Sequence, residues 1–241
     1  MAKAKTRRAA KSETAPRTTP GRRVWRLVTR GVLIVLGGVL LATFLYAAVN
    51  PPTTPYMVAE GRRNGGVEHV WVDMEEIAPV MARSVVAAED ANFCLHWGLD
   101  VRAIRLAMDE GAARGGSTIS QQVVKNLYLW QDRSWIRKAV EAVWTPVAEA
   151  VWSKRRILEL YLNMIEFDRG VFGVQAAAQH YFGVDAKDLS AVQAARLAAV
   201  LPSPKRRSAS EPSAEVRRRA ASILDGAATI AADGRAACFE E

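Results

Sequence analysis

The chain has 241 residues, half of them hydrophobic, so it can bury the core of one ordinary domain and is not a mostly disordered protein. Its formal net charge is +8, but residues 1–30 hold ten Lys and Arg against one acid, which leaves −1 for the other 211 residues. The positive charge therefore belongs to a tail, and no nucleic-acid partner is expected.

A basic tail and a membrane anchor are predicted at the N-terminus, over residues 1–26 and 27–50 respectively. The tail is rich in Lys, Arg, Ala, Thr and Pro, a composition typical of disordered arms. Residues 31–49 carry no charge, and as a helix they would reach about 28 Å, roughly the thickness of the hydrocarbon core of a bilayer. We expect Pro51 and Pro52 to end this helix, because proline cannot continue it.

A cleaved signal peptide is the alternative to this anchor. The apolar run is longer than a usual signal-peptide core, which favours an uncleaved helix. Under the positive-inside rule the basic tail stays in the cytoplasm. Everything after Asn50 then lies on the other side of the membrane, in a single-pass arrangement.

Beyond about residue 58 the apolar spacing predicts a mainly α protein. A first helix is expected through residues 77–88, and one short strand within residues 67–72. Ser190 and Ser213 are expected to cap the last two helices. The other predicted helices cover residues 101–110, 118–129, 135–153, 154–163, 173–182, 190–201 and 213–232.

The two cysteines, Cys94 and Cys238, are too few and too far apart to form a disulfide framework. They could pair in an oxidising compartment, but their spacing does not show it. The favoured expectation is one semi-buried cysteine and one cysteine in the tail, and whether the two pair stays open.

A first chemical cluster, at residues 89–100, places three acids, a histidine and two aromatic residues at the end of an apolar helix. Burial and the negative end of the helix dipole both raise the pKa of a carboxyl group. Glu89 would then suit proton transfer near neutral pH. The alternative is that Glu89 and Asp90 only cap or salt-bridge a turn.

A second cluster, at residues 115–126, begins with two glycines and continues with Ser and Thr at a predicted helix start. Free backbone N–H groups at such a start can bind an anion. Ser117, Gln121 and Lys125 are spaced by four and would line one stripe, which suits a ligand with phosphate and sugar groups. The alternative is a solvated helix face. The order of a phosphate-binding P-loop is absent.

A third cluster, at residues 132–141, places Arg133, Arg137 and Glu141 on one helical stripe with Lys138 beside it. These cations could neutralise a pyrophosphate leaving group. Glu141 could keep them ordered or hold a divalent metal ion. An ordinary surface ladder of ion pairs is the alternative.

Two further blocks, at residues 154–163 and 170–182, complete a series of five that resembles the peptidoglycan glycosyltransferase family. The family patterns are E-D-x-x-F-x-x-H-x-G-x-D at 89–100, G-[GA]-S-T-I-[ST]-Q-Q-x-x-K-N at 115–126, R-K-x-x-E at 137–141, K-x-x-I-L-E-x-Y-L-N at 154–163 and G-x-x-G-x-x-A-A-A-x-x-Y-F at 170–182. Ser-x-x-Lys and Lys-Thr-Gly do not occur, so the chain resembles the monofunctional members, which lack transpeptidase chemistry.

The resemblance implies a mainly α, lysozyme-like glycosyltransferase domain over residues 58–207, followed by a C-terminal helix and tail over 208–241. The implied substrates are lipid II, an undecaprenyl-pyrophosphoryl disaccharide-pentapeptide, and the nascent glycan strand. The implied location is the bacterial inner membrane, with the N-terminus cytoplasmic and the catalytic domain periplasmic. Other cell-wall synthesis and division proteins are possible partners.

Carried over by position, Glu89 resembles the general base that activates the 4-hydroxyl of the acceptor sugar. Glu141 resembles the second acid, which assists departure of undecaprenyl pyrophosphate or binds Mg²⁺. Asp90, His96 and Asn126 resemble supporting residues. The residues implied to bind the substrate are Ser117, Thr118, Gln121, Gln122, Lys125, Arg133, Arg137 and Lys138. Two alternatives stay open: a lytic transglycosylase or muramidase, which would share the acid pair, and a non-enzymatic subunit of a wall-building complex.

Overall fold

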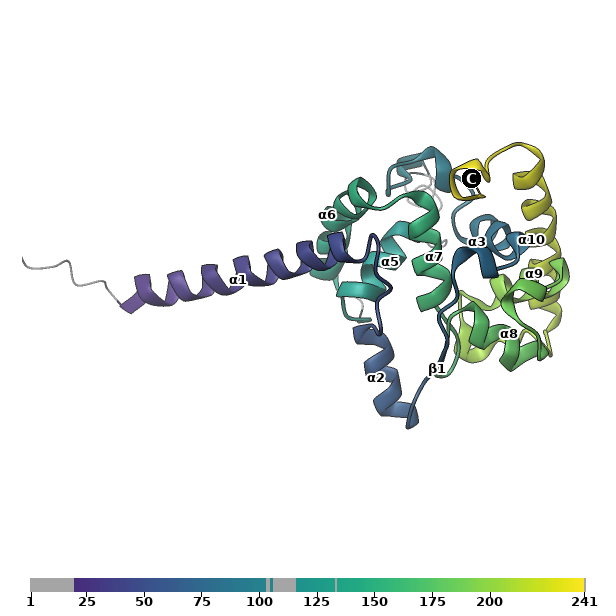
Figure 1. Ribbon diagram of the computed structural model, residues 1–241, viewed down its shortest axis with the longest axis horizontal. Helices are drawn as coiled ribbons and strands as arrows, with labels where there is room; N and C mark the ends of the chain where they lie inside the picture. The colour runs from purple at the N-terminus through teal and green to yellow at the C-terminus, as the bar shows by residue number, and fades with distance from the viewer. Residues whose placement is uncertain (1–19, 103–104, 106–115, 133, 241) are drawn as a thin grey trace, which may run out of the picture. The chain divides into compact units, whose positions relative to one another are not determined.

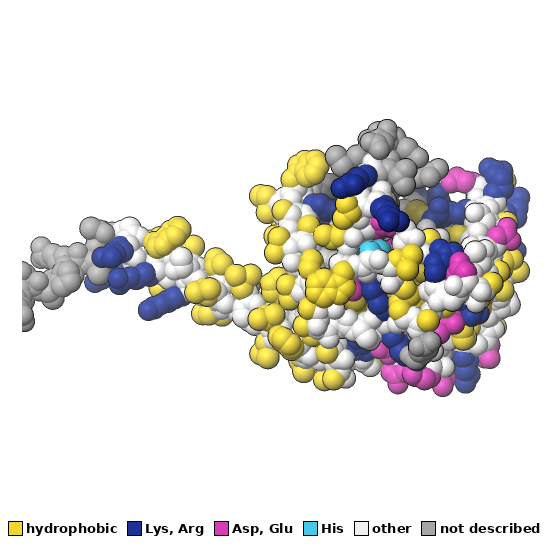
Figure 2. Space-filling view, turned by 90° about the horizontal axis from the view of Figure 1, so that it is seen from above, with side chains coloured by type: hydrophobic (Ala, Val, Ile, Leu, Met, Phe, Trp, Pro, Cys, Tyr) yellow, Lys and Arg dark blue, Asp and Glu magenta, His cyan; other side chains and the backbone are white. Residues whose placement is uncertain are grey.

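The computed structural model describes residues 20–102, 105, 116–132 and 134–240, and it divides into the units Met1–Ala42 and Thr43–Glu241. In the smaller unit the described residues belong to helix α1 (Pro20–Leu45). Of this helix, Gly21–Leu45 contains an 18-residue window with a mean hydropathy of 2.1 and is long and apolar enough to cross a membrane. Figure 2 shows dark-blue basic side chains near its start and hydrophobic side chains along the rest.

Helix α1 ends at Leu45, before the two prolines that we expected to end it. In a continuing helix the carbonyl of Thr43 would accept from the N–H of Ala47. Instead it accepts from the indole N–H of Trp152 at 2.7 Å, and Ala47 bonds the carbonyl of Phe44 in a tighter turn. Arg156 then donates to the carbonyl of Tyr46 at 2.9 Å. Side chains of the larger unit therefore terminate the helix.

The larger unit is mainly helical, as predicted (Figure 1). The helices are α2 (Pro55–Asn64), α3 (Pro79–Glu89), α5 (Ile119–Tyr128), α6 (Trp135–Val151), α7 (Lys154–Met164), α8 (Val174–Phe182), α9 (Ala191–Val200), α10 (Ala214–Ala232) and α11 (Ala237–Glu240). Short 3-10 helices are η1 (Met74–Glu76), η2 (Phe93–Leu95), η3 (Ala186–Asp188) and η4 (Pro204–Arg206). The helix predicted at 101–110 falls mostly outside the described residues.

The larger unit also contains a small three-stranded sheet. Its strands β1 (Glu68–His69), β2 (Glu166–Asp168) and β3 (Val171–Phe172) stand in the order β1-β3-β2. Strand β1 is parallel to β3, and β2 is antiparallel to it. The strand predicted within residues 67–72 is β1. Strands β2 and β3 were not predicted, because strands of three and two residues are too short to show alternation.

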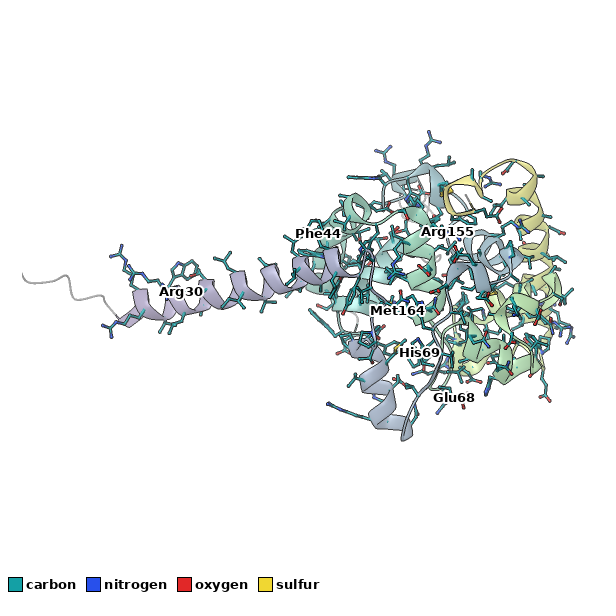
Figure 3. The ribbon with its side chains drawn as sticks, viewed as in Figure 1. Arg30, Phe44, Glu68, His69, Arg155 and Met164 are labelled. Carbon is teal, nitrogen blue, oxygen red and sulfur yellow. A yellow bond between two sulfur atoms is a disulfide. The ribbon has the colours of Figure 1, made fainter. Side chains whose placement is uncertain are left out.

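Asn163, the last residue of the fourth sequence block, ties the end of α7 to the segment after β1. Its side-chain oxygen accepts from the N–H of Val72 at 2.9 Å, and its amide donates to the carbonyl of the same residue at 2.9 Å. The ring of His69 bonds the Asn163 carbonyl at 3.0 Å, and Figure 3 labels His69 near Met164. The block therefore serves as scaffold.

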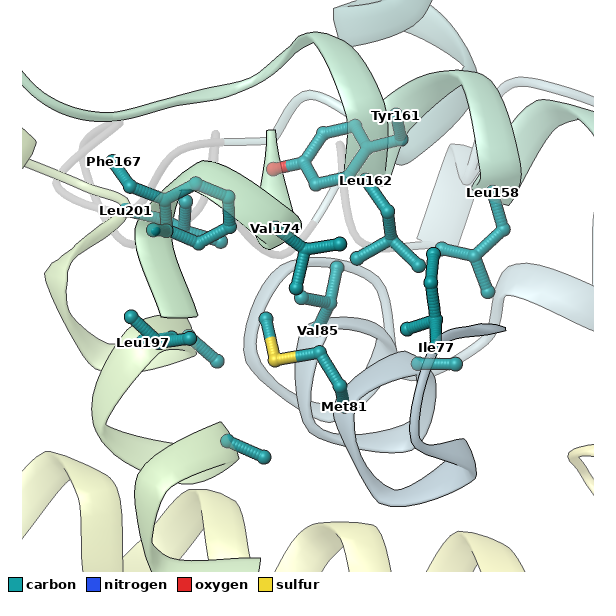
Figure 4. Packing of buried hydrophobic residues seen from close by; sticks show 14 of the residues in the cluster. Ile77, Met81, Val85, Leu158, Tyr161, Leu162, Phe167, Val174, Leu197 and Leu201 are labelled. Carbon is teal, nitrogen blue, oxygen red and sulfur yellow. The ribbon is translucent and has the colours of Figure 1, made fainter. Parts of the chain in front are cut away.

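The core is centred on helix α3, which has buried side chains on several sides. Met81 and Val85 of α3 are fully buried and face Leu158 and Leu162 of α7 and Val174 of α8 (Figure 4). Helices α9 and α10 pack on α3 and on each other, at the right of Figure 1. A helix enclosed in this way has little freedom to shift, so the residue at its end is held in a fixed place.

The C-terminal helix α10 approaches α3 closely. At Gly226 of α10 an added Cβ would lie only 3.1 Å from the Cβ of Ala87 in α3. The hydroxyl of Ser213 accepts from the N–H of Val216 and caps the start of α10, and Ser190 caps α9 in the same way, as predicted. This helix therefore packs against the element that carries Glu89.

The two cysteines, whose pairing the sequence left open, are bonded to each other. Cys94 and Cys238 form a disulfide with an S–S distance of 2.05 Å, across a sequence separation of 144 residues. It joins η2, just after α3, to the C-terminal helix α11. Phe93 and Phe239, next to the two cysteines, have ring centroids 6.4 Å apart. The pairing depends on how the last helix folds back, which spacing along the chain does not reveal.

Candidate active site

Glu89 is the last residue of helix α3, and its side chain is 16% exposed. The side-chain amide of Gln122 in α5 donates to Glu89 Oε2 at 3.0 Å. The hydroxyl of Tyr161 in α7 donates to Gln122 Oε1 at 3.4 Å, so the NH₂ group of the amide faces Glu89. Three helices thus hold this one carboxyl group.

Burial is the main influence on Glu89 and raises its pKa above the usual range of a glutamate. The hydrogen bond from Gln122 and the cations of Arg219 and Lys125 act in the opposite direction, while Asp90 adds to the rise. A carboxyl group with a raised pKa can accept a proton near neutral pH more readily than an exposed one. The direction of this shift is the one expected from the sequence.

Asp90 and His96 brace the loop that follows Glu89. His96 Nε2 lies 2.8 Å from Asp90 Oδ1, and the N–H of Ile119 donates to Asp90 Oδ2 at 3.0 Å. The second of these bonds fixes the start of α5 to the end of α3. The ammonium of Lys154 also donates to the His96 carbonyl at 2.8 Å. Both residues therefore lie where supports of the Glu89 loop were expected.

A cavity of about 360 Å³ opens between the end of α3 and the start of α5. Glu89 and Asp90 line it on one side, and Gly116, Ser117 and Thr118 on the other. The first two sequence clusters, 89–100 and 115–126, thus meet at one cavity.

Thr118 and Gln121 are both used in capping helix α5. The Thr118 hydroxyl accepts from the Gln121 N–H, and Gln121 Oε1 accepts from the Thr118 N–H at 3.1 Å. Gln121 is only 2% exposed, and Asn126 is 4% exposed and accepts from Gln131 at 3.2 Å. Of the two neighbouring glutamines, it is therefore Gln122 that reaches Glu89.

The third cluster forms a group of charges around Glu141, which is 2% exposed. Arg137 donates to Glu141 Oε2 at 2.6 Å, and Lys138 pairs with the other carboxylate oxygen. Lys138 also donates to the hydroxyl of Ser117 at 2.8 Å. Since Ser117 lines the cavity beside Glu89, the charge group borders that cavity. Arg133 lies outside the described residues.

Lys125, on α5, lies between Glu89 and the charge group. Burial lowers the pKa of its ammonium group, and the charges of Glu141, Arg137, Lys138 and Glu89 all act on it. Of the side chains described by the structure, none forms a hydrogen bond or ion pair with this ammonium group. A half-buried cation without a paired carboxylate suits an anionic ligand.

Comparison with known proteins agrees with the order of the blocks. A model of the family described as Transglycosylase matches residues 58–228. A biosynthetic peptidoglycan transglycosylase of Jannaschia sp. (strain CCS1) is 63% identical over 215 residues, which cover 89% of this chain and 90% of the relative. The chain belongs to the transglycosylase family. Proteins of the same name in Caulobacter vibrioides and Rhodospirillum centenum are 43% and 45% identical and cover 86% and 89% of the chain.

The donor atoms at Glu141 of this transglycosylase do not fit a divalent metal ion as they stand. Both carboxylate oxygens are already paired with cations, Arg137 and Lys138, and a doubly charged ion would be repelled by them and by Lys125. The ligand atoms of Asp90, His96 and Asp100 lie within 4.8 Å of one another. Hydrogen bonds engage them too, because Asp90 accepts from His96 and Asp100 accepts from Asn92 at 2.9 Å.

Sequence reasoning missed one charged residue of this transglycosylase site, Arg219 of α10, whose guanidinium lies 3.7 Å from Glu89 Oε1. The sequence of α10 does contain a signal for this residue. Val216, Ala220 and Ile223 form the buried stripe of α10, and position 219 lies at the edge of that stripe. A basic residue at such an edge can reach a neighbouring helix, but the sequence does not say which helix that is.

Proposed function

We propose that this chain polymerises glycan strands by base-assisted displacement at the cavity beside Glu89. The chain is a peptidoglycan glycosyltransferase by homology, since the family match covers most of it and a biosynthetic relative is 63% identical. The single observation that supports the mechanism is the position of Glu89. Its largely buried carboxyl group lines one side of the cavity, and Lys138 of α6 donates to Ser117 on the other side.

In the proposed step, Glu89 accepts the proton of the acceptor sugar's 4-hydroxyl on lipid II. The hydroxyl oxygen then forms a bond to the anomeric carbon of the growing strand, and the bond from that carbon to the diphosphate oxygen breaks. The electron pair leaves with undecaprenyl pyrophosphate. Attack opposite the leaving group inverts an α-linked donor to a β-1,4 bond.

The cations stabilise the negative charge that develops on the departing diphosphate. We assign this role to Lys125, Arg137 and Lys138, with Arg133 as a further candidate. They act most strongly where water is excluded, and Lys125 is half-buried. Glu141 then serves to keep Arg137 and Lys138 ordered. Ser117 and Gln122 are the predicted substrate-binding residues that face this region, while Thr118 and Gln121 act through the cap of α5.

A requirement for Mg²⁺ stays a prediction, and no step above uses a metal ion. The fit at Glu141 argues against holding the ion there while Arg137 and Lys138 are in place.

A lytic transglycosylase or muramidase is the competing function. It would use an acid pair on finished glycan and would need no site for a diphosphate. The cationic cluster beside the cavity favours synthesis, because it matches a diphosphate leaving group. The names of the relatives are also biosynthetic.

We place the catalytic unit in the periplasm, anchored by α1 with the basic tail in the cytoplasm. The basic residues before the apolar helix favour this orientation. The Cys94–Cys238 disulfide supports it independently, since structural disulfides persist in the bacterial periplasm and are rare in the cytosol. An association with other proteins of wall synthesis and division remains a prediction.

The deciding experiment compares the purified chain with its Glu89→Gln variant on lipid II. We expect the unaltered chain to form polymer and Glu89→Gln to lose at least about a hundredfold in rate, because general-base assistance is worth that much. Glu211→Gln, an exposed acid on the same unit, is the matched control and should polymerise normally. Normal polymerisation by Glu89→Gln would show that the assigned base is wrong. Release of fragments from mature sacculi without polymer would support the lytic alternative.

A further inference from the structure

Helix α10 brings one arginine to the end of α3, where Glu89 lies. Arg219 Nη2 donates to the carbonyl of Ala88 at 3.3 Å and lies 3.7 Å from Glu89 Oε1. Arg219 Nε is buried and has no hydrogen-bond partner among the described residues. The guanidinium group is thus held at the last turn of α3, directed at one backbone carbonyl and one carboxylate.

We propose that Arg219 is a positioning residue for Glu89, which keeps its carboxylate ionised and oriented toward the acceptor hydroxyl. The proposal rests on the proposed function, in which Glu89 is the general base. It assigns a task to the C-terminal helix α10, for which the sequence suggested none.

The backbone of α10 is fixed well enough for this task. Val216, Ala220 and Ile223 are buried on both sides of Arg219, and Gly226 lets α10 approach α3 one turn further on. The adjacent Arg218, by contrast, is exposed. Of these two arginines, only the one at the edge of the buried stripe reaches Glu89.

Charges from each neighbouring element act on Glu89. Asp90, on the loop after α3, disfavours ionisation, and so does burial itself. Lys125 of α5 and Arg219 of α10 favour it, while Tyr161 of α7 faces the site as a neutral hydroxyl. When a diphosphate binds, its negative charge would compete with Glu89 for Lys125. Arg219 lies on α10 and would remain as the cation that favours the ionised form of Glu89.

The sign of the effect follows from these charges. Glu89 must be deprotonated to act as a base, so the rate rises with pH through its pKa. Removing the positive charge of Arg219 takes away one of the influences that lower the pKa of Glu89. Burial and Asp90 should then raise the pKa of Glu89 further. The acidic limb of the rate profile should therefore move to higher pH.

The test measures lipid II polymerisation from pH 5 to 9 for Arg219→Gln, Arg219→Lys and the control Arg218→Gln. We expect the acidic limb of kcat for Arg219→Gln to move up by roughly one pH unit, with a rate about tenfold lower at pH 6 and a near-normal rate at pH 9. The acidic limb for Arg219→Lys should lie between those of Arg219→Gln and the unaltered chain. The profile of Arg218→Gln should match that of the unaltered chain. The KM for lipid II should change less than about twofold, since Arg219 does not hold the diphosphate.

A rate that falls equally at every pH, or an equal effect of Arg218→Gln, would overturn the proposal and leave Arg219 with packing alone. A second readout does not depend on activity or on the base assignment. Carboxyl-carbon NMR of labelled glutamates, with Glu89→Gln to assign the signal, should show Glu89 titrating at higher pH in Arg219→Gln. An unchanged titration would also overturn the proposal. If Glu89→Gln polymerised normally while this titration moved, the proposed function would fail and the role of Arg219 in ionising Glu89 would stand.

Discussion

At the scale of single residues, the site depends on which of several similar side chains faces the cavity. Gln121 and Gln122 are neighbours, yet one caps α5 and the other donates to Glu89. Arg218 and Arg219 are neighbours, yet one is exposed and the other lies against α3. A helix turns about 100° per residue, so adjacent positions reach different neighbours.

Lys125 should contribute to donor binding and to leaving-group stabilisation. We expect Lys125→Ala to lower kcat/KM for lipid II by about a hundredfold, because a charge-assisted contact in a dry site is worth roughly 3 kcal/mol. Lys187→Ala is the matched control, since Lys187 is exposed and forms only a surface ion pair with Glu76 at 3.5 Å. Steady-state polymerisation with both variants checks this. Equal small losses would mean that Lys125 is only a solvated lysine of the helix.

At the scale of elements, the segment that follows Glu89 is held by the middle of the chain and by its C-terminal end. The Asp90 carboxylate fixes it to the start of α5, and the Cys94–Cys238 disulfide fixes η2 to α11. Arg155 of α7, labelled in Figure 3, donates to the Phe239 carbonyl at 3.0 Å and holds α11 from the other side. The C-terminal segment is therefore a brace for the loop that follows the proposed base.

Reduction of the disulfide should destabilise the larger unit. Cross-linking residues that are 144 positions apart restricts the unfolded chain, and a loss of about 2–5 kcal/mol is expected when the bond is removed. The thermal midpoint of the protein in detergent should fall when dithiothreitol is added. The Cys94→Ser/Cys238→Ser double variant should show the lower midpoint with or without reductant. Equal midpoints for all these samples would contradict the bracing role.

At the scale of the whole molecule, a charged tail and an apolar helix precede a unit that itself carries almost no net charge. The apolar helix Gly21–Leu45 suits a membrane anchor, and a lipid-linked substrate would lie in the same membrane. An anchor raises the effective concentration of such a substrate at the site.

The orientation can be tested with alkaline phosphatase, which becomes active only after export. A fusion after Glu241 should be active in cells, and a fusion before Met1 should be inactive, because the basic tail is retained in the cytoplasm. The mass of the membrane-extracted protein should equal that of the full chain if α1 is an uncleaved anchor. The opposite pattern of activity would invert the proposed topology, and a shorter mass would support a signal peptide.

Local pattern was sufficient for much of this protein. Helices α5 to α10 lie within two residues of their predicted limits, because apolar periodicity and caps such as Ser190 and Ser213 are properties of neighbouring residues. The five blocks were also enough to name the family and to select Glu89, and their order along the chain carries that information.

What the tertiary structure alone decided are the contacts between residues far apart in the sequence. Three features belong to this class. Cys94 pairs with Cys238, α1 ends at Leu45 where the indole of Trp152 donates to its last turn, and Arg219 approaches Glu89. Each depends on how two helices pack, and packing is set by the whole core rather than by the spacing of residues in one segment.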